Sequence, residues 1–543
     1  MLIQMKECTS NQGLKEHLCY NGGNFIVRKG CLPMSEQHYA IIDIGSNTVR
    51  LVVYERSESG RFKEIENIKA VARLRNYLGE DFNLSEEGIE NLLSILRSFK
   101  KVTDTYELEQ LLCVATATIR QSLNQEMITK RVKDELGHDM RILSEEEEAY
   151  YGYLAVVNST ALREGITVDI GGGSTEVTYY KDKEIKHSHS FPFGALTLKQ
   201  MFVKDDVPSA KEMENVKNYL MEQYHSLSWL TDRKVPVIGI GGSARNMAQV
   251  DQSLKSYPLA GLHQYRMFEH DMSFIKSYLL TLSFKKLQKV EGLTKDRADI
   301  ILPAIEVFHS LYEVTDATSF ILSRKGLRDG VFYEQLMEDF NITVFPDVLE
   351  ESFNELAIDY NINYKHVHQV THLAQIMFDE LQEAEVSHLT REDVTLLKRG
   401  AFVFNLGEYI DSESSSQHTF YLLANRTIDG LMHKERLMLA LVASYKSKPI
   451  FKQYLHPYKH WFLKEEKKKI RTLGALTKFA YSFDSTRRSV VEDLHVEVKG
   501  EDINIVAFCN QDPMAEEYQV EKQKKHLEKA LKMRINITFT QKG

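Results

Sequence analysis

The 543-residue chain lacks paired cysteines and any long apolar run. Its five cysteines are scattered without a CxxC spacing, which gives no sign of a disulfide framework and favours free thiols in a reducing cytoplasm. No segment approaches the ~18 apolar residues that a membrane helix needs. We therefore expect a cytoplasmic protein with no membrane contact.

The chain also lacks an excess of positive charge. Its 68 Lys and Arg are outnumbered by 77 Asp and Glu, so the formal net charge is −9. Bulk electrostatics therefore predicts no nucleic-acid partner, and any phosphate chain must be held by local basic residues. The length is too great for one core and predicts three or four domains.

Residues 1–33 lack the apolar stretch of a signal peptide and show no helical or strand period. They nevertheless hold three of the five cysteines, and Met34 follows shortly before the first apolar strand. We expect translation to start at Met34, so that residues 1–37 are an extension to the native protein. An intact mass of the natively expressed protein that includes residues 1–33 would contradict this.

What the chain does have is three glycine-rich turns, each after an apolar strand. Backbone N–H groups in such turns bind oxyanions, and a neighbouring carboxylate suits a hard divalent cation. A single turn of this kind can also be a plain tight hairpin. Two of them, however, align on Asp43 and Asp169 as one hairpin used twice, which predicts a duplicated α/β core with phosphate between its halves. The three segments are AIIDIGSNTVRLVVY (40–54), ITVDIGGGSTEV (166–177) and VPVIGIGGSAR (235–245).

The segments between these turns predict further elements. Residues 111–119 are typical of a buried strand that ends at Arg120. The acidic run at 145–148 is typical of a helix N-terminus, where it favours the macrodipole. This run is either a solvated first turn or the source of a base that points toward the phosphate.

From about residue 345 the pattern is almost wholly helical, and the last part predicts a hairpin, a helix and a final strand. We interpret the histidines at 366, 368 and 372 as hydrogen-bonded or solvated rather than as metal ligands. A basic cluster forms either a path for a polyanion or a solvated face, and its members are Lys467, Lys468, Lys469, Arg471, Arg487 and Arg488.

Seven ordered motifs together resemble the exopolyphosphatase / guanosine pentaphosphate phosphatase family: DIGSNTVRLVV, ATATIR, SEEEEA, DIGGGSTE, GIGGSAR, GLTKDRADI and GLRDG. The resemblance is strong from about residue 38 to 335 and weaker beyond. It implies the ribonuclease H-like α/β fold of actin, sugar kinases and heat-shock chaperones, with subdomains at 38–145 and 146–335. It also implies an all-α, HD-like domain at 336–455 and a small α+β domain at 456–543.

The resemblance implies a role for each motif residue. Glu148 matches the catalytic base, and Asp43, Asp169 and Glu176 match the acidic residues that hold Mg²⁺ or another divalent cation. The matching phosphate-binding residues are Gly45, Ser46, Asn47, Arg73, Arg120, Gly171, Gly172, Gly173, Ser174, Gly241, Gly242 and Ser243.

The chain departs from the family pattern at four positions. Ala117 and Glu145 replace a usual serine and glycine, which are mild changes. Phe404 and Asn405 stand where HD-type hydrolases carry a metal-binding His-Asp pair. Because phenylalanine cannot ligate a metal, we expect the helical domain to form a wall of a polyphosphate channel or a dimer contact.

These features predict a Mg²⁺-dependent exopolyphosphatase that releases the terminal phosphate of inorganic polyphosphate, acting as a homodimer. A pppGpp 5′-phosphatase is the nearest alternative, because both substrates end in a phosphoanhydride. A sugar kinase of the same fold is disfavoured by the acidic helix start at Glu148. A non-catalytic polyphosphate or nucleotide sensor is disfavoured by the joint presence of Glu148, Asp169 and Glu176.

Overall fold

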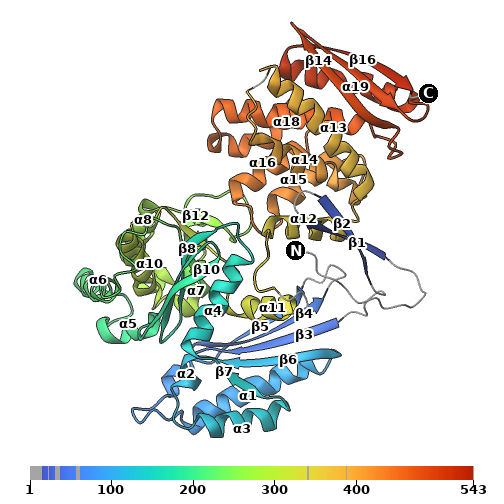
Figure 1. Cartoon of the computed structure of the whole chain (residues 1–543). Coiled ribbons are helices and arrows are strands. Elements are labelled where there is room, and N and C mark those ends of the chain that lie inside the picture. The colour runs from blue at the N-terminus through green and yellow to red at the C-terminus, as the bar shows by residue number, and fades with distance from the viewer. Residues whose placement is uncertain are drawn as a thin grey trace.

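The computed structural model describes residues 15–21, 24–30, 37–56, 62–338, 342–386 and 388–541. Two mixed sheets with the same strand order lie below the C-terminal part in the view of Figure 1. The first has the order β5-β4-β3-β6-β7, and the second has β10-β9-β8-β11-β13 with β12 added at its edge. The strands of the first sheet are β3 (Gln37–Ile44), β4 (Thr48–Arg56), β5 (Phe62–Val71), β6 (Leu108–Ala115) and β7 (Met140–Ile142). Those of the second are β8 (Glu164–Ile170), β9 (Thr175–Lys181), β10 (Glu184–Phe191), β11 (Val237–Ile240), β12 (Tyr265–Met267) and β13 (Phe320–Leu322).

The strand directions repeat as well as the order. Within each sheet the first three strands in the chain form an antiparallel meander, and the first of them also pairs in parallel with the next strand, β6 or β11. The duplicated α/β core expected from the two Asp-Gly turns is therefore confirmed. Register explains the apolar runs: in β3, Ala40, Ile42 and Ile44 face one helical layer, while Ile41 faces the other.

Helices cover the outer face of each sheet. On the first sheet these are α1 (Glu86–Thr103) and α3 (Gln125–Leu136), and α1 starts at Ser85, whose hydroxyl accepts from the N–H of Gly88 as expected for an N-cap. The corresponding helices of the second half are α5 (Ala195–Phe202), α6 (Ala210–His225), α7 (Gly241–Leu254), α8 (Glu269–Leu280) and α10 (Ile301–Thr315). Short helical turns complete the core: η1 (Leu74–Tyr77), α2 (Ala117–Arg120), α9 (Phe284–Leu287) and η2 (Lys295–Arg297).

The inner faces are covered by two exchanged helices. Helix α4 (Glu145–Val157) follows the first sheet in the chain but packs on strands β8, β9 and β10 of the second. Helix α11 (Leu327–Glu338) follows the second sheet and packs on the first, where the rings of Phe332 and Tyr54 lie 4.2 Å apart. The two helices also pack on each other, and their apolar residues form one core with both sheets.

The crossing of α4 and α11 depends on a glycine. A Cβ added at Gly330 would lie 2.7 Å from the carbonyl carbon and 2.8 Å from the Cα of Tyr151, both backbone atoms that cannot turn aside. We expect Gly330→Ala to lower the free energy of unfolding by about 1–3 kcal/mol, the cost of overpacking. Gly152→Ala on α4 is the matched control, because its Cβ would meet only the side-chain tip of Ile240 at 3.4 Å. Denaturant unfolding of both variants makes the comparison, and equal stabilities would contradict the close crossing.

The C-terminal part is helical first and mixed afterwards. Its strands form a small sheet of order β14-β15-β16, antiparallel and then parallel, and a single hydrophobic core joins the helices to this sheet. The predicted hairpin, helix and last strand are thus present. The helices are α12 (Val348–Asp359), α13 (Tyr364–Glu383), α14 (Asp393–Phe402), η3 (Leu406–Tyr409), α15 (Ser415–Asn425), α16 (His433–Ala443), α17 (Lys448–Leu455), η4 (His456–Trp461) and α18 (Lys464–Ser482). Then come β14 (Val491–Lys499), β15 (Asp502–Cys509), α19 (Met514–Leu531) and β16 (Arg534–Gln541).

Three local predictions were wrong. The strand expected at 111–119 ends at Ala115, because the next residues turn into α2. The third glycine turn is the first turn of α7 rather than a loop. Residues 15–30, which show no strand period, contain the antiparallel pair β1 (Lys15–Asn21) and β2 (Asn24–Gly30). Among the described residues no helix is long and apolar enough to span a membrane.

Two hydrogen bonds of His433 connect the helical part to the second half of the core. The Tyr257 hydroxyl lies 2.9 Å from Nδ1 of His433, and Nε2 of His433 lies 3.0 Å from the carbonyl oxygen of His263. Both ring nitrogens of His433 therefore have partners in the neutral form, with the tyrosine donating to Nδ1. Burial, together with the charge of the nearby Arg436, lowers the pKa of His433 to about 3.

This histidine should make the protein sensitive to acid. The histidine of an unfolded chain titrates near pH 6.5. Below that pH the unfolded state therefore binds a proton that the folded state does not bind. The neutral His433 makes its full contribution to the free energy of unfolding above pH ~6.5. This contribution is lost as the pH falls toward 3, and the loss is about 2 kcal/mol at pH 5. Denaturant unfolding at pH 7.5 and pH 5 should therefore show a drop in stability about 2 kcal/mol larger for the wild type than for His433→Gln. Equal drops would contradict this prediction.

Candidate functional site

The two Asp-Gly turns have the same hydrogen bonding. In the first, the N–H of Gly45 donates to the carbonyl of Thr48 at 3.0 Å, and in the second, that of Gly171 donates to Ser174 at 2.9 Å. In each turn the aspartate stands two residues before that glycine. The turns also touch, because a Cβ added at Gly172 would lie 3.1 Å from Cβ of Ser46. The duplication thus brings Asp43 and Asp169 to the junction of the two sheets.

The N-terminus of α7 is the third part of the site. Gly241 has φ +83°, a left-handed conformation that favours glycine, and a Cβ there would meet the carboxylate of Asp169. The guanidinium of Arg297 covers Gly242 and donates to the hydroxyl of Ser243 at 3.1 Å. A helix of 14 residues starts here, and its first N–H groups have no partner within the helix, so they favour an anion.

Four carboxyl groups, one buried (Glu176) and three half-buried (Asp43, Glu148 and Asp169), lie within electrostatic range of one another. Burial raises the pKa of Asp169 to about 6, and the neighbouring Asp43 adds to the shift. Burial likewise raises the pKa of Asp43, opposed by Arg328 and Arg50. The pKa of Glu176 is raised by burial and by Glu148. Four such groups without a cation repel one another, so the cluster favours a bound positive charge or a shared proton.

Glu148 lies in the first turn of α4. The helix starts at Ser144, which forms a capping box with Glu147, so Glu147 is used in the cap while Glu148 points to the carboxyl cluster. The guanidinium of Arg120 donates to Glu148 and, at 2.8 Å, to the carbonyl of Leu143. Burial still raises the pKa of Glu148 above its usual range, with Asp169 and Asp43 contributing, although Arg120 opposes the shift.

Sequence reasoning missed four arginines of the site. Arg50 lies opposite Asp43 across β3 and β4, the position that Glu176 occupies opposite Asp169 across β8 and β9. Arg328 reaches Asp43, with Nη1 3.6 Å from Oδ2. Burial lowers the pKa of Arg245 to about 10, together with the charges of four neighbouring arginines: Arg324, Arg50, Arg328 and Arg297. The four missed arginines, Arg50, Arg245, Arg297 and Arg328, all belong to the quoted motifs, so an arginine inside or next to a glycine turn was the available signal.

Several donors at the site have no hydrogen-bond partner among the described residues, although they are buried. They are Nδ2 of Asn47, Nε of Arg245 and Nη2 of Arg120, the last of which lies 3.6 Å from Oε1 of Glu145, within ion-pair but not hydrogen-bond distance. Unpaired buried donors are costly, and they are rare in folded proteins. The unpaired donors of Asn47, in the first Asp-Gly turn, and of Arg245, near the start of α7, indicate a site that is completed by an anion.

Not every residue predicted to bind phosphate has its side chain at the site formed by the two turns and α7. The backbone N–H of Arg73 donates to the carbonyl of Asn47 at 2.9 Å, but the side chain of Arg73 is exposed. In the part of the chain that the structure describes, no hydrogen bond or ion pair links this side chain to the carboxyl cluster. Ser46 and Ser174 are buried, and a Cβ at Gly173 would meet nothing within 4 Å. The second turn therefore has free space next to Gly173.

The carboxyl groups fit a magnesium ion that is shared with substrate. Within the described residues no three acidic, histidine or cysteine side chains are close enough to hold a metal by themselves. Magnesium usually binds one or two carboxylates and takes its other ligands from phosphates and water. Asp169 and Glu176 are direct partners across β8 and β9, so both side chains point to the same face of the sheet. This donor set suits the ion once phosphate is present.

The helical part has a different chemistry at the positions of the His-Asp pair. Phe404 packs on Tyr481 at a centroid distance of 5.0 Å, and the amide of Asn405 donates to Glu408 at 3.3 Å. His366 is buried, and its Nδ1 lies 2.8 Å from Oδ2 of Asp484. These side chains support packing and local hydrogen bonding.

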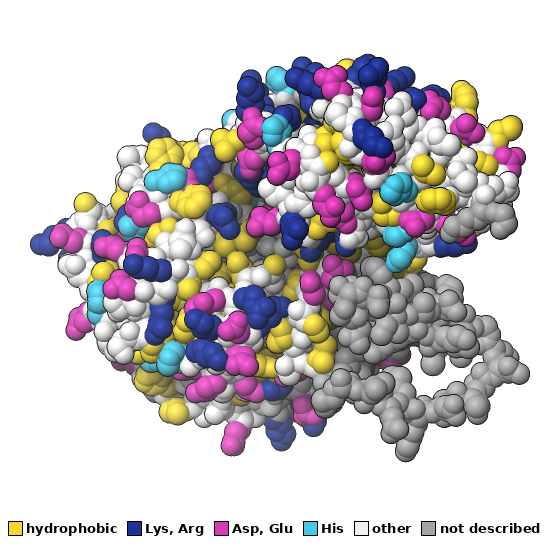
Figure 2. Space-filling model, turned by 45° about the horizontal axis from the view of Figure 1, so that its top comes forward, with side chains coloured by type: hydrophobic (Ala, Val, Ile, Leu, Met, Phe, Trp, Pro, Cys, Tyr) yellow, Lys and Arg dark blue, Asp and Glu magenta, His cyan; other side chains and the backbone are white. Residues whose placement is uncertain are grey.

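The basic cluster predicted at 467–488 is partly neutralised. Lys469 pairs with Asp393 at 3.0 Å, Arg487 with Glu408 at 2.6 Å and Arg488 with Glu516 at 2.9 Å. Acidic and basic side chains are interspersed over most of the face in Figure 2. The cluster is therefore a weaker candidate for a polyanion path than its sequence indicates.

Fold and site together define a hydrolase of phosphoanhydride bonds on an actin-like core. The model of the Ppx/GppA phosphatase family matches residues 52–339, more than half of the chain, and that of its domain III matches residues 348–529. The chain belongs to the Ppx/GppA phosphatase family.

Similar proteins agree with this assignment. A guanosine-5′-triphosphate,3′-diphosphate pyrophosphatase of Vibrio vulnificus is 26% identical over 415 residues, which cover 75% of this chain and 80% of the relative. The homologue of that name in Aeromonas hydrophila is 25% identical over 433 residues, covering 76% and 83%. A Ppx/GppA family member of Aquifex aeolicus is 27% identical in sequence, with a TM-score of 0.50 over 56% of this chain and 99% of its own. An exopolyphosphatase of Cytophaga hutchinsonii shares the fold at 21% identity, with a TM-score of 0.51 over 56% and 98%.

Proposed function

We propose that this phosphatase hydrolyses the terminal phosphoanhydride of linear phosphate chains, inorganic polyphosphate first and pppGpp second. One observation carries the proposal: buried carboxyl groups with raised pKa values lie beside a surplus of arginines and unpaired donors. Such a pairing is suited to a ligand that is itself anionic and brings a divalent cation. The names of the relatives favour pppGpp as the second candidate.

The phosphate cradle consists of three backbone segments. The turns at 45–47 and 171–174 and the first turn of α7 (241–243) supply N–H groups to the phosphate oxygens. Arg245 and Arg297 stabilise the charge that develops on the phosphoryl group, and Arg120 does so while it holds Glu148. In this proposal Arg73 contributes through its backbone position beside Asn47.

Asp169 and Glu176 are the residues that would hold Mg²⁺, or another divalent cation, together with the substrate phosphates. When bound, the ion neutralises phosphate charge and polarises the bond to be broken. Asp43 is already paired with Arg328, so we assign it a weaker part in metal binding than the sequence suggested.

Glu148 orients a water molecule and accepts its proton as the water attacks the terminal phosphorus. Its raised pKa suits a base that works near neutral pH, and Arg120 fixes its carboxylate.

Phosphate release from long-chain polyphosphate and from pppGpp, each with Mg²⁺ and with EDTA, tests the proposal. We expect release from both with Mg²⁺, faster with polyphosphate, and little with EDTA. A strong preference for pppGpp would make that nucleotide the principal substrate. Binding of both substrates without release would favour the sensor function.

We also propose a homodimer in the cytoplasm. Cys113 and Cys509 are buried and unpaired, as a reducing compartment allows. Light scattering after gel filtration gives the oligomeric state, and a monomer at micromolar concentration would contradict the dimer.

A further inference from the structure

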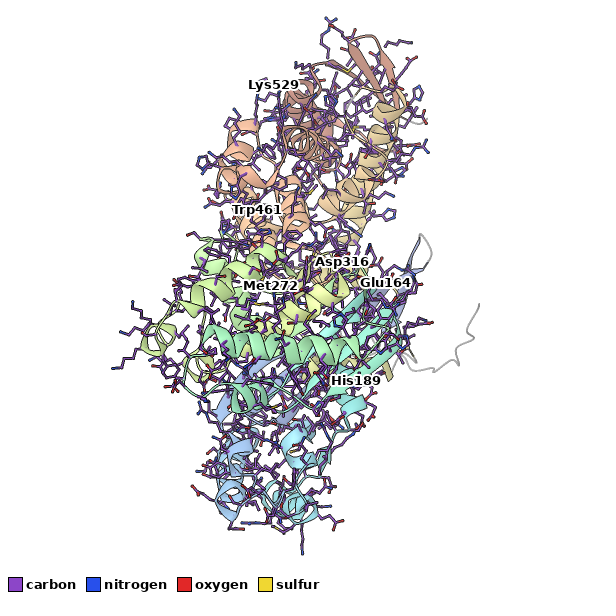
Figure 3. All side chains as sticks on the ribbon, turned by 90° about the vertical axis from the view of Figure 1, so that its left-hand side faces the viewer. Glu164, His189, Met272, Asp316, Trp461 and Lys529 are labelled. Carbon is purple, nitrogen blue, oxygen red and sulfur yellow. The ribbon has the colours of Figure 1, made fainter. Side chains whose placement is uncertain are left out.

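A second cavity lies where the helical part meets the second half of the core. Its volume is about 650 Å³, within the range of small-molecule sites, and junctions between domains often hold such sites. One wall comes from residues 255–271, between the end of α7 and the start of α8, and the other from the start of α16 and from η4. None of the predicted site residues lines it. Figure 3 shows Trp461, one of its lining residues, at this seam beside the second half.

Aromatic rings line much of this cavity. The ring of Tyr257 lies 5.2 Å from that of Trp461 and 4.8 Å from that of Tyr265. Phe268 and His270 stack in parallel, 6.0 Å apart at 9°, and Phe268 remains 43% exposed. An exposed phenylalanine beside a partly apolar hollow offers a flat face on which a planar ring can stack.

The charges around the cavity are mostly positive. Lys255, Arg266 and Lys434 line it with a single carboxylate, Asp271, but Lys255 also pairs with Asp251 and Lys434 pairs with Glu466, each at 2.7 Å. Asp271 is buried and already pairs with Lys255 at 2.6 Å and with His270 at 3.1 Å. Arg266 is exposed, and the structure shows no ion pair for it among the described residues. The cavity therefore combines stacking surface with one cation, Arg266, that has no ion pair among the described residues.

We propose that this cavity binds a nucleotide, with the base stacked on Phe268 and Trp461 and the phosphate held by Arg266. A free phosphate chain would leave the rings unused, and a neutral aromatic compound would leave Arg266 without a partner. The site is independent of the phosphatase site and of the substrate proposed for it.

The cavity is nevertheless connected to the phosphatase site through the fold. Lys255 directly follows α7, whose other end is the phosphate-binding turn, and a helix of this length spans about 20 Å. Strand β12 pairs with β13, and the chain then runs on to Arg328. A nucleotide bound here would therefore lie beside the residue that follows α7 and beside the strand that pairs with β13.

The chain has two tryptophans, Trp229 and Trp461, so the cavity contains its own fluorescent reporter. Trp229 stacks on His187 elsewhere, and Trp229→Phe leaves Trp461 as the single reporter. This variant is titrated with AMP and GMP, which have no phosphoanhydride bond and so are not phosphoanhydride substrates. Adenosine and ribose 5-phosphate are titrated in parallel. We expect saturable quenching by at least one monophosphate below ~1 mM, and binding at least about tenfold weaker for each of the other two compounds.

Two further variants in the Trp229→Phe background locate the site. Arg266→Ala and Phe268→Ala should each weaken monophosphate binding about tenfold or more, by loss of a charge-assisted contact and of stacking. Arg163→Ala is the control, because this exposed arginine pairs with Asp182 outside the cavity. Phosphate release from polyphosphate should be unchanged in all of them without nucleotide. The proposal is overturned if no monophosphate quenches Trp461, if adenosine binds as well as AMP, or if the cavity variants bind like the control.

Discussion

Replacing Glu148 by glutamine is expected to reduce phosphate release from polyphosphate by about 10²–10⁴-fold, the usual contribution of a general base. Glutamine keeps the size of the side chain and an oxygen that can accept from Arg120, but it cannot take the proton of water. Burial, which raises the pKa of Glu148, shows that the carboxyl group lies inside the site. Polyphosphate binding should stay within a few-fold of the wild type. Steady-state release and a direct binding isotherm measure the two quantities.

Glu146→Gln is the matched control for this experiment. Glu146 lies in the same helical turn and undergoes the same chemical change, but its side chain is exposed. It should retain nearly all of the activity. Near-normal turnover of Glu148→Gln would show that another group takes the proton, and loss of binding in that variant would indicate a role in holding substrate.

Replacing Arg245 by methionine should have opposite effects on catalysis and on stability. A charge-assisted hydrogen bond contributes about 1.5–3 kcal/mol, so kcat/KM should fall about 10–150-fold. The free energy of unfolding without substrate should stay constant or rise. Neighbouring arginines and burial lower the pKa of Arg245, and its buried Nε has no partner among the described residues. Removing the guanidinium therefore removes repulsion and an unpaired donor.

Arg163→Met controls for the general loss of an arginine, because Arg163 pairs with Asp182 on the outer part of the second sheet. It should change neither quantity. A large loss of stability in Arg245→Met would mean that this arginine holds the fold together rather than the phosphate.

The sequence was sufficient to predict the parts of the site that depend on local chemistry. Glycines and aspartates in the turns at 43–48 and 169–174 follow apolar strands, and both turns have the predicted shape with matching hydrogen bonds. The start of α4 was likewise predictable, since Ser144 and the glutamates after it form a helix N-terminus. Each of these features depends only on residues within about ten positions of one another in the sequence.

Features that depend on distant segments could not be predicted in the same way. Arg328 approaches Asp43 only because α11 returns to the first sheet, almost 300 residues further along the chain. Arg73 resembles a phosphate ligand in sequence, but its left-handed backbone at φ 46° leaves the side chain exposed. The neutralisation of Arg487 and Arg488 also requires partners from other helices.

The exchange of α4 and α11 has a consequence for synthesis on the ribosome. The inner face of the first sheet is complete only after α11 has emerged, although strand β7 ends at Ile142 and α11 ends at Glu338. Because the ribosome adds about 5–20 residues per second, the inner face of the first sheet stays uncovered for roughly 10–40 s until α11 has been synthesised. During that interval Ile41, Val52 and Tyr54 have no final partner, so the nascent first half depends on slow, long-range completion. The interlocked architecture that joins both halves of the site therefore delays the folding of its first half.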